Sequence, residues 1–271
     1  MMVSVLVLAA GAARRFGGRP KTLVQLPGPD GPETVLDRHR RLWLDAGAAR
    51  VVVVTNPSLV ESFRPYAREG LELVIADDGS TGSALSLRCG LQALTSGPFP
   101  NADQGIVVLD GDTVYEPDLA RQVLAQPFRT ALFATPASGG DDEEVRVYAR
   151  PDGGPALLGK AISAEAARGL RLIGESMGVV ALAAADVPRV EAVLDWMVGN
   201  PPAWSAHVSS GQRTEHEDLW QCLFALGALE VALVSESLLF SEFDTEAEYQ
   251  AVLRNLLPAI RDRAQRPAGQ W

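Results

Sequence analysis

Short apolar runs alternate with segments of helical spacing through the first half of the chain. Runs rich in β-branched residues and bounded by polar loops are typical of strands buried on both faces of a parallel sheet. We expect such strands at residues 3–9, 51–54, 71–75 and 106–109, with a helix at 34–44. This rhythm predicts an α/β fold with a doubly wound, mostly parallel sheet and right-handed crossovers.

The second half of the chain has a different pattern. Two apolar runs, 131–134 and 145–149, predict strands separated by a polar loop, and Asp152-Gly153-Gly154 predicts a tight turn. Further on we expect a strand at 176–182 and helices at 186–198, 216–227 and 245–257. These segments favour one elaborated domain, residues 1–255, with an insertion in its second half, and a polar C-terminal tail, residues 256–271.

Composition limits the classes of protein to consider. Of the 271 residues, 47% are hydrophobic and 21% are charged, as in globular proteins with a sizeable core. The net charge of −10 argues against a nucleic-acid partner, which would favour a basic surface. Cys89 and Cys222 lack the spacing of a zinc site. The N-terminal apolar stretch is too short to cross a membrane. We therefore expect a cytoplasmic protein with no membrane partner. The sequence leaves its oligomeric state open, and a homodimer is one possibility.

The loop after the first predicted strand is suited to an anion. It begins Leu8-Ala9-Ala10-Gly11, continues through Arg15, and ends with Pro20 before Lys21. Small residues let the backbone approach a ligand closely, consecutive amides can form an anion-binding nest, and the two cations add full charges. The Gly-Lys-Ser/Thr of a Walker loop is absent. An ordinary turn with surface arginines would explain the glycine alone, but the combined order predicts a triphosphate site.

Two acidic segments could hold a divalent cation. Asp110-Gly111-Asp112 follows a buried strand, and carboxylates at a strand end suit Mg²⁺, although an Asp-Gly turn is an equally ordinary explanation. Asp244 lies far along the chain, just before Thr245 and Glu248, where it could also cap a helix. Because parallel strands end at one edge of a sheet, we expect the first acidic loop and the N-terminal loop to face one crevice.

The N-terminal loop resembles the signature loop of nucleotidyltransferases that activate phosphorylated small molecules. The matching residues are Leu8-Ala9-Ala10-Gly11, Arg15, Gly17 and Pro20-Lys21. The resemblance implies that Leu8, Ala10 and Gly11 contact a nucleoside triphosphate, with Lys21 and Arg15 on its phosphates. It also implies that Asp112 is a metal ligand and that Asp110 has a supporting role.

Later segments resemble bacterial phosphocholine and phosphonate cytidylyltransferases. The stretch 238–249 is similar to one in which the last acid completes the metal site, which implies a ligand role for Asp244, although Phe240 replaces a tryptophan and Phe243 an isoleucine. The segment Thr81 to Leu87 implies a nucleotide contact for Ser83. The segments at 158–160, 174–179 and 216–220 imply acceptor contacts for Lys160, Glu175, Glu217 and Asp218, with His216 where the family has tyrosine.

Ordinary structural roles remain open for these acceptor residues. Lys160 could be a solvated loop lysine, and Glu217 and Asp218 could be first-turn charges that complement a helix dipole. If the resemblance holds, Lys160 orients the acceptor phosphate, and one of the two acids binds an acceptor amine. We assign no function to His39 or His207.

The resemblance implies a Mg²⁺-dependent cytidylyltransferase. It would transfer CMP from CTP to a small phosphonate or phosphomonoester and release pyrophosphate, with Lys21, Arg15 and Lys160 acting by charge rather than as bases. The preference for CTP rests on the resemblance alone. The alternatives are a sugar-1-phosphate or molybdenum-cofactor type nucleotidyltransferase that uses another triphosphate, and a non-catalytic nucleotide-binding homologue.

Overall fold

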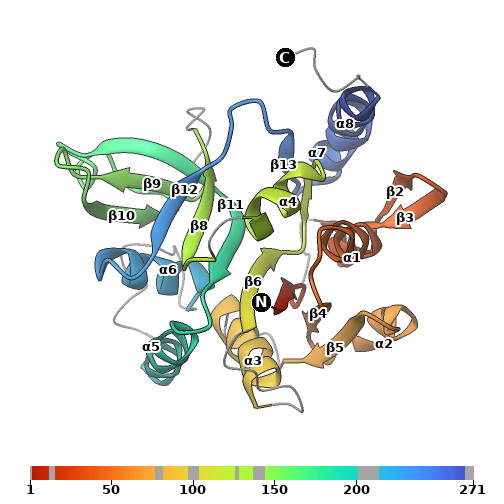
Figure 1. Cartoon of the computed structure of the whole chain (residues 1–271), viewed down its shortest axis with the longest axis horizontal. Helices are drawn as coiled ribbons and strands as arrows, with labels where there is room; N and C mark the ends of the chain where they lie inside the picture. Colours follow the sequence, from red (N-terminus) through yellow and green to blue (C-terminus); the bar gives the residue numbers. More distant parts are fainter. Residues whose placement is uncertain are drawn as a thin grey trace.

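A computed structural model describes residues 2–11, 16–76, 82–96, 104–125, 128–136, 144–200 and 214–265 of the chain. Arg15, Thr81 and His207, which the sequence analysis discussed, lie outside these ranges. The described residues contain one large mixed sheet, two small antiparallel pairs and helices on both faces of the large sheet (Figure 1). None of the described helices is long and apolar enough to cross a membrane.

The parallel half of the large sheet confirms the expected doubly wound fold. Its strands are β1 (Met2–Leu8), β4 (Arg50–Thr55), β5 (Leu71–Ile75) and β6 (Gln104–Asp110). The chain runs outward from β1 through β4 to β5 and then returns to β6 on the other side of β1. The strand order therefore reverses between β1 and β6, and doubly wound sheets bind ligands at such a switch point.

The register of β1 against β6 brings the two predicted loops together. Leu8 pairs with Asp110, the last residue of β6. The backbone N–H of Gly111 donates to the Leu8 carbonyl at 3.1 Å, and a Cβ on Gly111 would come within 2.7 Å of that oxygen. Glycine is required here because the two loops approach so closely.

The second half of the chain extends the sheet with mostly antiparallel strands. The long strand β11 (Arg171–Leu182) pairs with β8 (Ala131–Thr135) along one side. Along its other side, the second half of β11 pairs with β6 and the first half pairs with β9 (Arg146–Ala149). Strand β10 (Pro155–Gly159) pairs with β9, and β12 (Glu230–Leu233) pairs with β8. Strand β11 begins earlier than the expected residue 176, and it contains a bulge between Ser176 and Val179.

Helices cover both faces of the sheet (Figure 1). On one face lie α3 (Ser83–Thr95), α5 (Val187–Gly199) and α6 (His216–Ala225). On the other lie α1 (Val35–Asp45), the short α2 (Val60–Phe63) and α4 (Asp118–Ala125). Strand β1 supplies both cores in alternation, because Leu6 packs under α3 while Val5 and Val7 pack on the opposite side.

Two small strand pairs complete the sheet structure. Strands β2 (Gln25–Gly28) and β3 (Gly31–Thr34) form a hairpin. Strands β7 (Thr113–Tyr115) and β13 (Phe240–Glu242) pair antiparallel, with Glu242 opposite Thr113. This second pair carries the late acidic segment to the end of β6.

The C-terminal region is more ordered than the expected polar tail. Helix α7 (Glu246–Ala251) continues through a π-helical turn, Val252–Leu256, into α8 (Leu257–Ala264). Leu257 and Ile260 of α8 are buried, and Arg263 donates to Glu116 at 2.8 Å. Helix α8 thus packs on the rest of the fold, whereas residues 266–271 lie outside the described ranges. The division into a domain of residues 1–255 and a tail of 256–271 stays a prediction.

Candidate active site

Lys21 joins the two predicted metal ligands. Pro20 precedes it, and Lys21 opens a 3-10 turn that runs to Leu23. Its Nζ lies 2.6 Å from Asp112 Oδ2 and also donates to Asp244 Oδ1. Burial disfavours the ammonium charge, but the charges and hydrogen bonds of Asp112 and Asp244 outweigh it and raise the pKa of Lys21 above its usual range. Asp112 and Asp244, to which the resemblance assigns one metal site, thus meet at Lys21, and their role as metal ligands stays a prediction.

A third carboxylate completes this cluster. Oxygens of Asp112, Glu242 and Asp244 lie within 4.8 Å of one another. Loss of surrounding water, together with repulsion from Asp112 and Asp110, raises the pKa of Glu242 to about 8. The pKa of Asp112 is also raised, by burial and by Asp110, against the opposing effect of Lys21. Three carboxylates stand against one ammonium here, so oxygen ligands and an excess of negative charge both suit a hard divalent cation, and the donor set fits Mg²⁺.

Glu242 is not among the site residues predicted from the sequence. Its signal is its spacing from Asp244, because side chains two residues apart point to the same side of an extended chain. The capping interpretation of Asp244 applies instead to Thr245, whose hydroxyl accepts from the Glu248 amide at 3.3 Å. Asp244 itself directs its carboxylate toward Lys21.

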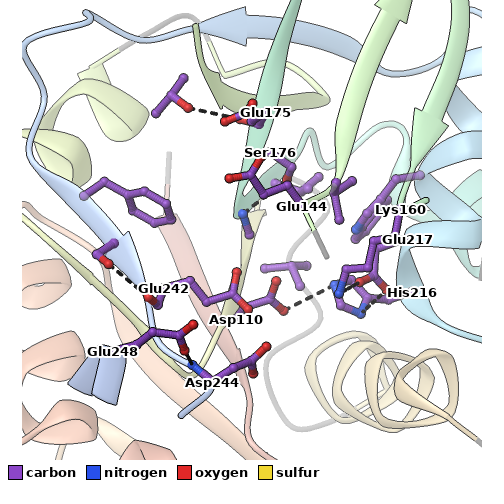
Figure 2. Close-up of a pocket in the computed structure, with 18 of the residues that line it drawn as sticks. Asp110, Glu144, Lys160, Glu175, Ser176, His216, Glu217, Glu242, Asp244 and Glu248 are labelled. Carbon is purple, nitrogen blue, oxygen red and sulfur yellow. Dashed lines mark hydrogen bonds and ion pairs between the residues drawn. The ribbon is translucent and has the colours of Figure 1, made fainter. Parts of the chain in front are cut away.

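Asp110 and Asp112 face different partners. Asp110 Oδ1 lies 3.2 Å from His216 Nε2, and the figure shows this carboxylate pointing toward the imidazole (Figure 2). On its other side is Gly178 in the β11 bulge, with φ +64° and a Cβ position only 2.5 Å from Asp110 Oδ2. Asp110 is thus held between β11 and α6, close enough to repel Asp112 and Glu242 but outside the group of three carboxylates that could share one ion.

A pocket of about 380 Å³ extends from the acidic cluster along the second half of the sheet. Its charged lining residues are Asp110, Glu144, Lys160, Glu175, His216, Glu217, Glu242, Asp244 and Glu248 (Figure 2). Lys160 and His216 are the cations among these described residues. The pocket therefore lies between the strand-end cluster and the antiparallel extension, where a second substrate could meet a nucleotide.

Lys160 and Glu217 form an ion pair on the pocket wall. Lys160 Nζ lies 3.2 Å from Glu217 Oε1. Burial opposes both charges, but each is stabilised by the other's opposite charge, so the pKa of Lys160 is raised and that of Glu217 is lowered. His216 also stabilises Glu217, and Glu242 and Asp110 also stabilise Lys160. Helix α6 fixes the neighbouring strand as well, because Gln221 Oε1 accepts from the Leu158 amide at 2.5 Å.

Two other predicted contacts are engaged within the fold. Ser83, at the start of α3, donates from its amide and its hydroxyl to Glu215 at 2.8 and 2.6 Å. Asp218 is 2% exposed and accepts from the Glu215 amide at 2.9 Å in the capping box of α6. Asp218 is absent from the pocket lining formed by the described residues. The nucleotide contact of Ser83 and the acceptor contact of Asp218 stay predictions.

The remaining predicted residues take varied places. Leu8 and Ala10 offer their carbonyls to the Gly111 amide and to Asn56 Nδ2, the latter at 2.7 Å, and Gly11 is exposed at the loop. Glu175 lines the pocket, as Lys160 and Glu217 do. Arg15 lies outside the described residues. The structure thus brings Lys21 together with Asp112 and Asp244, and it places Lys160, Glu175 and Glu217, but not Asp218, in the wall of the pocket that the described residues form.

Comparison with known proteins assigns the family. Residues 5–180 match the model of the MobA-like NTP transferase domain. This chain belongs to that family. The nucleotidyltransferase resemblance of the N-terminal loop is therefore confirmed, and the match runs from within β1 through β10 and most of β11.

Two curated relatives match part of this NTP transferase. Both are described as the bifunctional enzyme IspD/IspF of Caulobacter vibrioides, from two strains, and each is 39% identical over 99 residues. The match covers 36% of this chain and spans only 25% of the length of these relatives.

Solved structures resemble this NTP transferase over nearly its whole length. An inositol-1-phosphate CTP transferase from T. maritima has a TM-score of 0.65 at 18% identity, covering 96% of this chain and 97% of its own. A CTP:phosphocholine cytidylyltransferase from Streptococcus pneumoniae has a TM-score of 0.61 at 15% identity, covering 93% of this chain and 98% of its own. These likenesses confirm the fold class.

Proposed function

We propose that this nucleotidyltransferase transfers CMP from CTP to a small phosphonate or phosphomonoester and releases pyrophosphate. The observation that carries the proposal is the meeting of Lys21 with Asp112 and Asp244 at the switch point of the sheet, beside a pocket that contains Lys160. The two solved structures named above are an inositol-1-phosphate CTP transferase and a CTP:phosphocholine cytidylyltransferase, which favours CTP as the donor.

The reaction needs positioning and charge neutralisation rather than a protein base. An ionised oxygen of the acceptor attacks the α-phosphorus of CTP, a new O–P bond forms, and the bond to the bridging oxygen of the pyrophosphate breaks. Lys21 would exchange its carboxylate partners for phosphate oxygens as the triphosphate binds, and it would stabilise the charge that builds up there. Arg15 would hold the departing pyrophosphate.

The acidic cluster is the proposed Mg²⁺ site. Asp112 and Asp244 would hold the ion, and Glu242 lies close enough to join them. When bound, the ion supplies positive charge at the triphosphate. The protein's own contribution is to hold these carboxylates together through the β7–β13 pair, which fixes Glu242 beside the residue that follows Asp112.

Lys160 is the proposed contact for the acceptor phosphoryl group. It lies on the pocket wall, and its ion pair with Glu217 holds its ammonium in place. The many carboxylates of this wall, Glu175 and Glu217 among them, favour an acceptor that also carries an amine, as 2-aminoethylphosphonate does. A phosphonate that carries a hydroxyl group in place of the amine is the other candidate acceptor, and the two classes can be compared in the same assay. A location in the cytoplasm and a homodimeric state stay predictions.

A pyrophosphate-release assay tests the proposed function. The protein is incubated with Mg²⁺ and each of CTP, ATP, GTP and UTP, without and with a panel of phosphonates and phosphomonoesters. We expect release that requires both CTP and an acceptor and that is lost in Lys21→Ala. A preference for another triphosphate would overturn the cytidylyl assignment, and release without any acceptor would mean hydrolysis rather than transfer.

A further inference from the structure

A histidine ring connects the strand-end carboxylate with the acceptor lysine. His216 Nε2 lies 3.2 Å from Asp110 Oδ1, and His216 Nδ1 lies 3.2 Å from Glu217 Oε2. The other oxygen of Glu217 lies 3.2 Å from Lys160 Nζ. Four charged groups of alternating sign therefore run from β6 across α6 to the end of β10 (Figure 2).

The hydrogen-bond partners of His216 require both ring nitrogens to carry a proton. Ser83 has one hydroxyl hydrogen, which it donates to Glu215 Oε2 at 2.6 Å. The Ser83 oxygen accepts from the His216 amide at 2.8 Å and lies 2.8 Å from His216 Nδ1, so Nδ1 must donate to it as well. Nε2 faces the carboxylate of Asp110 and must also donate. A ring with two donors is an imidazolium.

The surroundings of the ring support this charge. Burial alone would lower the pKa of His216, and Lys160 acts in the same direction, but Glu217 and Asp110 outweigh both and raise it to about 10. The groups that face the ring are Asp110 from β6, Ser83 from α3, Glu217 and Trp220 from α6, and Lys160. Two of them are acids that need a positive partner.

We propose that His216 is a permanently charged positioning residue of the acceptor site, which balances Asp110 and Glu217 so that Lys160 can receive the phosphoryl dianion of the acceptor. This inference rests on the proposed function. With His216 charged, two cations face two carboxylates and the group is neutral. With a neutral residue in its place, the group would carry a net negative charge and would repel the acceptor. A tyrosine, which the resembling family has at this place, could not supply the charge.

The first test separates this positioning role from a merely structural one. His216→Gln keeps hydrogen-bonding atoms and removes the charge, so the acceptor KM should rise by roughly 10- to 100-fold while the KM for CTP changes by less than about twofold. His216→Lys, which restores a cation, should recover part of the acceptor affinity. Arg129→Gln is the control for loss of one positive charge, because its exposed pair with Glu230 lies elsewhere. An unchanged acceptor KM in folded His216→Gln would overturn the proposal.

The second test needs no turnover. The chain has three histidines, so selective ¹⁵N labelling gives few imidazole signals. At pH 8, without nucleotide or acceptor, we expect one ring with both nitrogens protonated, and its signal should vanish in His216→Gln. His39 is the internal contrast, because burial lowers its pKa to about 3 and keeps it neutral. A neutral His216 at pH 8 would overturn the proposal whatever the kinetics show.

A binding measurement distinguishes failure of this inference from failure of the proposed function. Calorimetric titration with methylphosphonate, a minimal dianion, should show weaker binding in His216→Gln than in the unmodified protein, by about tenfold or more, with a similar loss in Lys160→Ala. If the unmodified protein binds methylphosphonate in this manner but transfers no nucleotide, the proposed function fails and the role of His216 stands. Equal binding by both proteins overturns that role.

Discussion

Lys21 and Asp244 are 223 residues apart in the sequence, yet the Lys21 ammonium donates directly to the Asp244 carboxylate. The ion pair joins the N-terminal loop, where we expect the triphosphate, to the segment just after β13. Asp112 shares the same ammonium, so a cation already sits among the carboxylates that we assign to Mg²⁺. Substrate binding must therefore rearrange these contacts.

Removing either carboxylate should abolish most of the turnover while the fold is retained. We expect Asp112→Asn and Asp244→Asn each to lower kcat by at least ~10²–10³-fold, because each loses a charge aimed at the reacting groups. Steady-state kinetics with thermal unfolding measures both effects. Glu61→Gln, which removes an exposed carboxylate paired with Arg64, is the control. Full activity of the Asp244 variant would leave that residue with no part in the site.

Replacing Lys21 and replacing Lys160 should change different kinetic constants. Lys21→Ala should depress kcat strongly, because its charge acts where negative charge develops in the transition state. Lys160→Ala should raise the acceptor KM and leave the dissociation constant of CTP nearly unchanged. Kinetics with calorimetric CTP titrations of both variants checks this division. Loss of CTP binding in Lys160→Ala, with acceptor kinetics untouched, would place that lysine on the nucleotide side instead.

The sequence predicted the parallel half of the fold well and the extension less well. Strands such as 51–54 are runs of valine, whose burial on both faces leaves a clear local signal. Strand β11 begins at Arg171, where polar residues and Gly174 interrupt the apolar pattern, and a bulge shifts its register there. The sequence does not predict helix α8, because arginines surround Leu257 and Ile260, which are its buried residues.

The site residues likewise divide into those with a local signal in the sequence and those that distant parts of the chain bring together. The loop of Lys21 and the Asp110-Gly111-Asp112 turn have local signals, and their meeting follows from parallel strands ending at one edge. The approach of Asp244 depends on the pairing of β13 with β7, which no sequence pattern predicted. The family resemblance implied only that Asp244 completes the metal site. The charge of His216 depends on Asp110 and Ser83, distant residues that no local pattern connects to it.

Gly178 should be a sensitive position for the acceptor site. Its positive φ disfavours any side chain, and a Cβ would press on Asp110. We expect Gly178→Ala to destabilise the protein by more than the ~1–2 kcal/mol that the backbone conformation alone costs, and to raise the acceptor KM. Gly153→Ala is the matched control, because Gly153 also has a positive φ but its Cβ would meet no atom within 4 Å. Urea unfolding of both variants measures the difference, and equal losses would show that Asp110 yields freely.

Glu242 should make stability fall with rising pH when divalent cations are chelated. Its pKa is about 8 in the fold against an ordinary 4.5, so between these values the unfolded chain releases a proton that the folded protein retains. The unfolded state then binds fewer protons, and the free energy of unfolding decreases as pH rises through this window. His216 contributes a decrease of the same sign at higher pH, because its pKa is also raised.

Chemical unfolding in EDTA from pH 5 to pH 8 isolates the contribution of Glu242. We expect Glu242→Gln to lose less stability over this range than the unmodified protein, because glutamine has no carboxyl proton to release. Added Mg²⁺ should stabilise the unmodified protein more at pH 8 than at pH 5, because a larger fraction of Glu242 is then ionised and able to serve as a ligand. It should stabilise the variant less. If the free energy of unfolding depends on pH in the same way for both proteins, Glu242 ionises at its ordinary pKa. The carboxylates of the acidic cluster would then repel one another less than their geometry indicates.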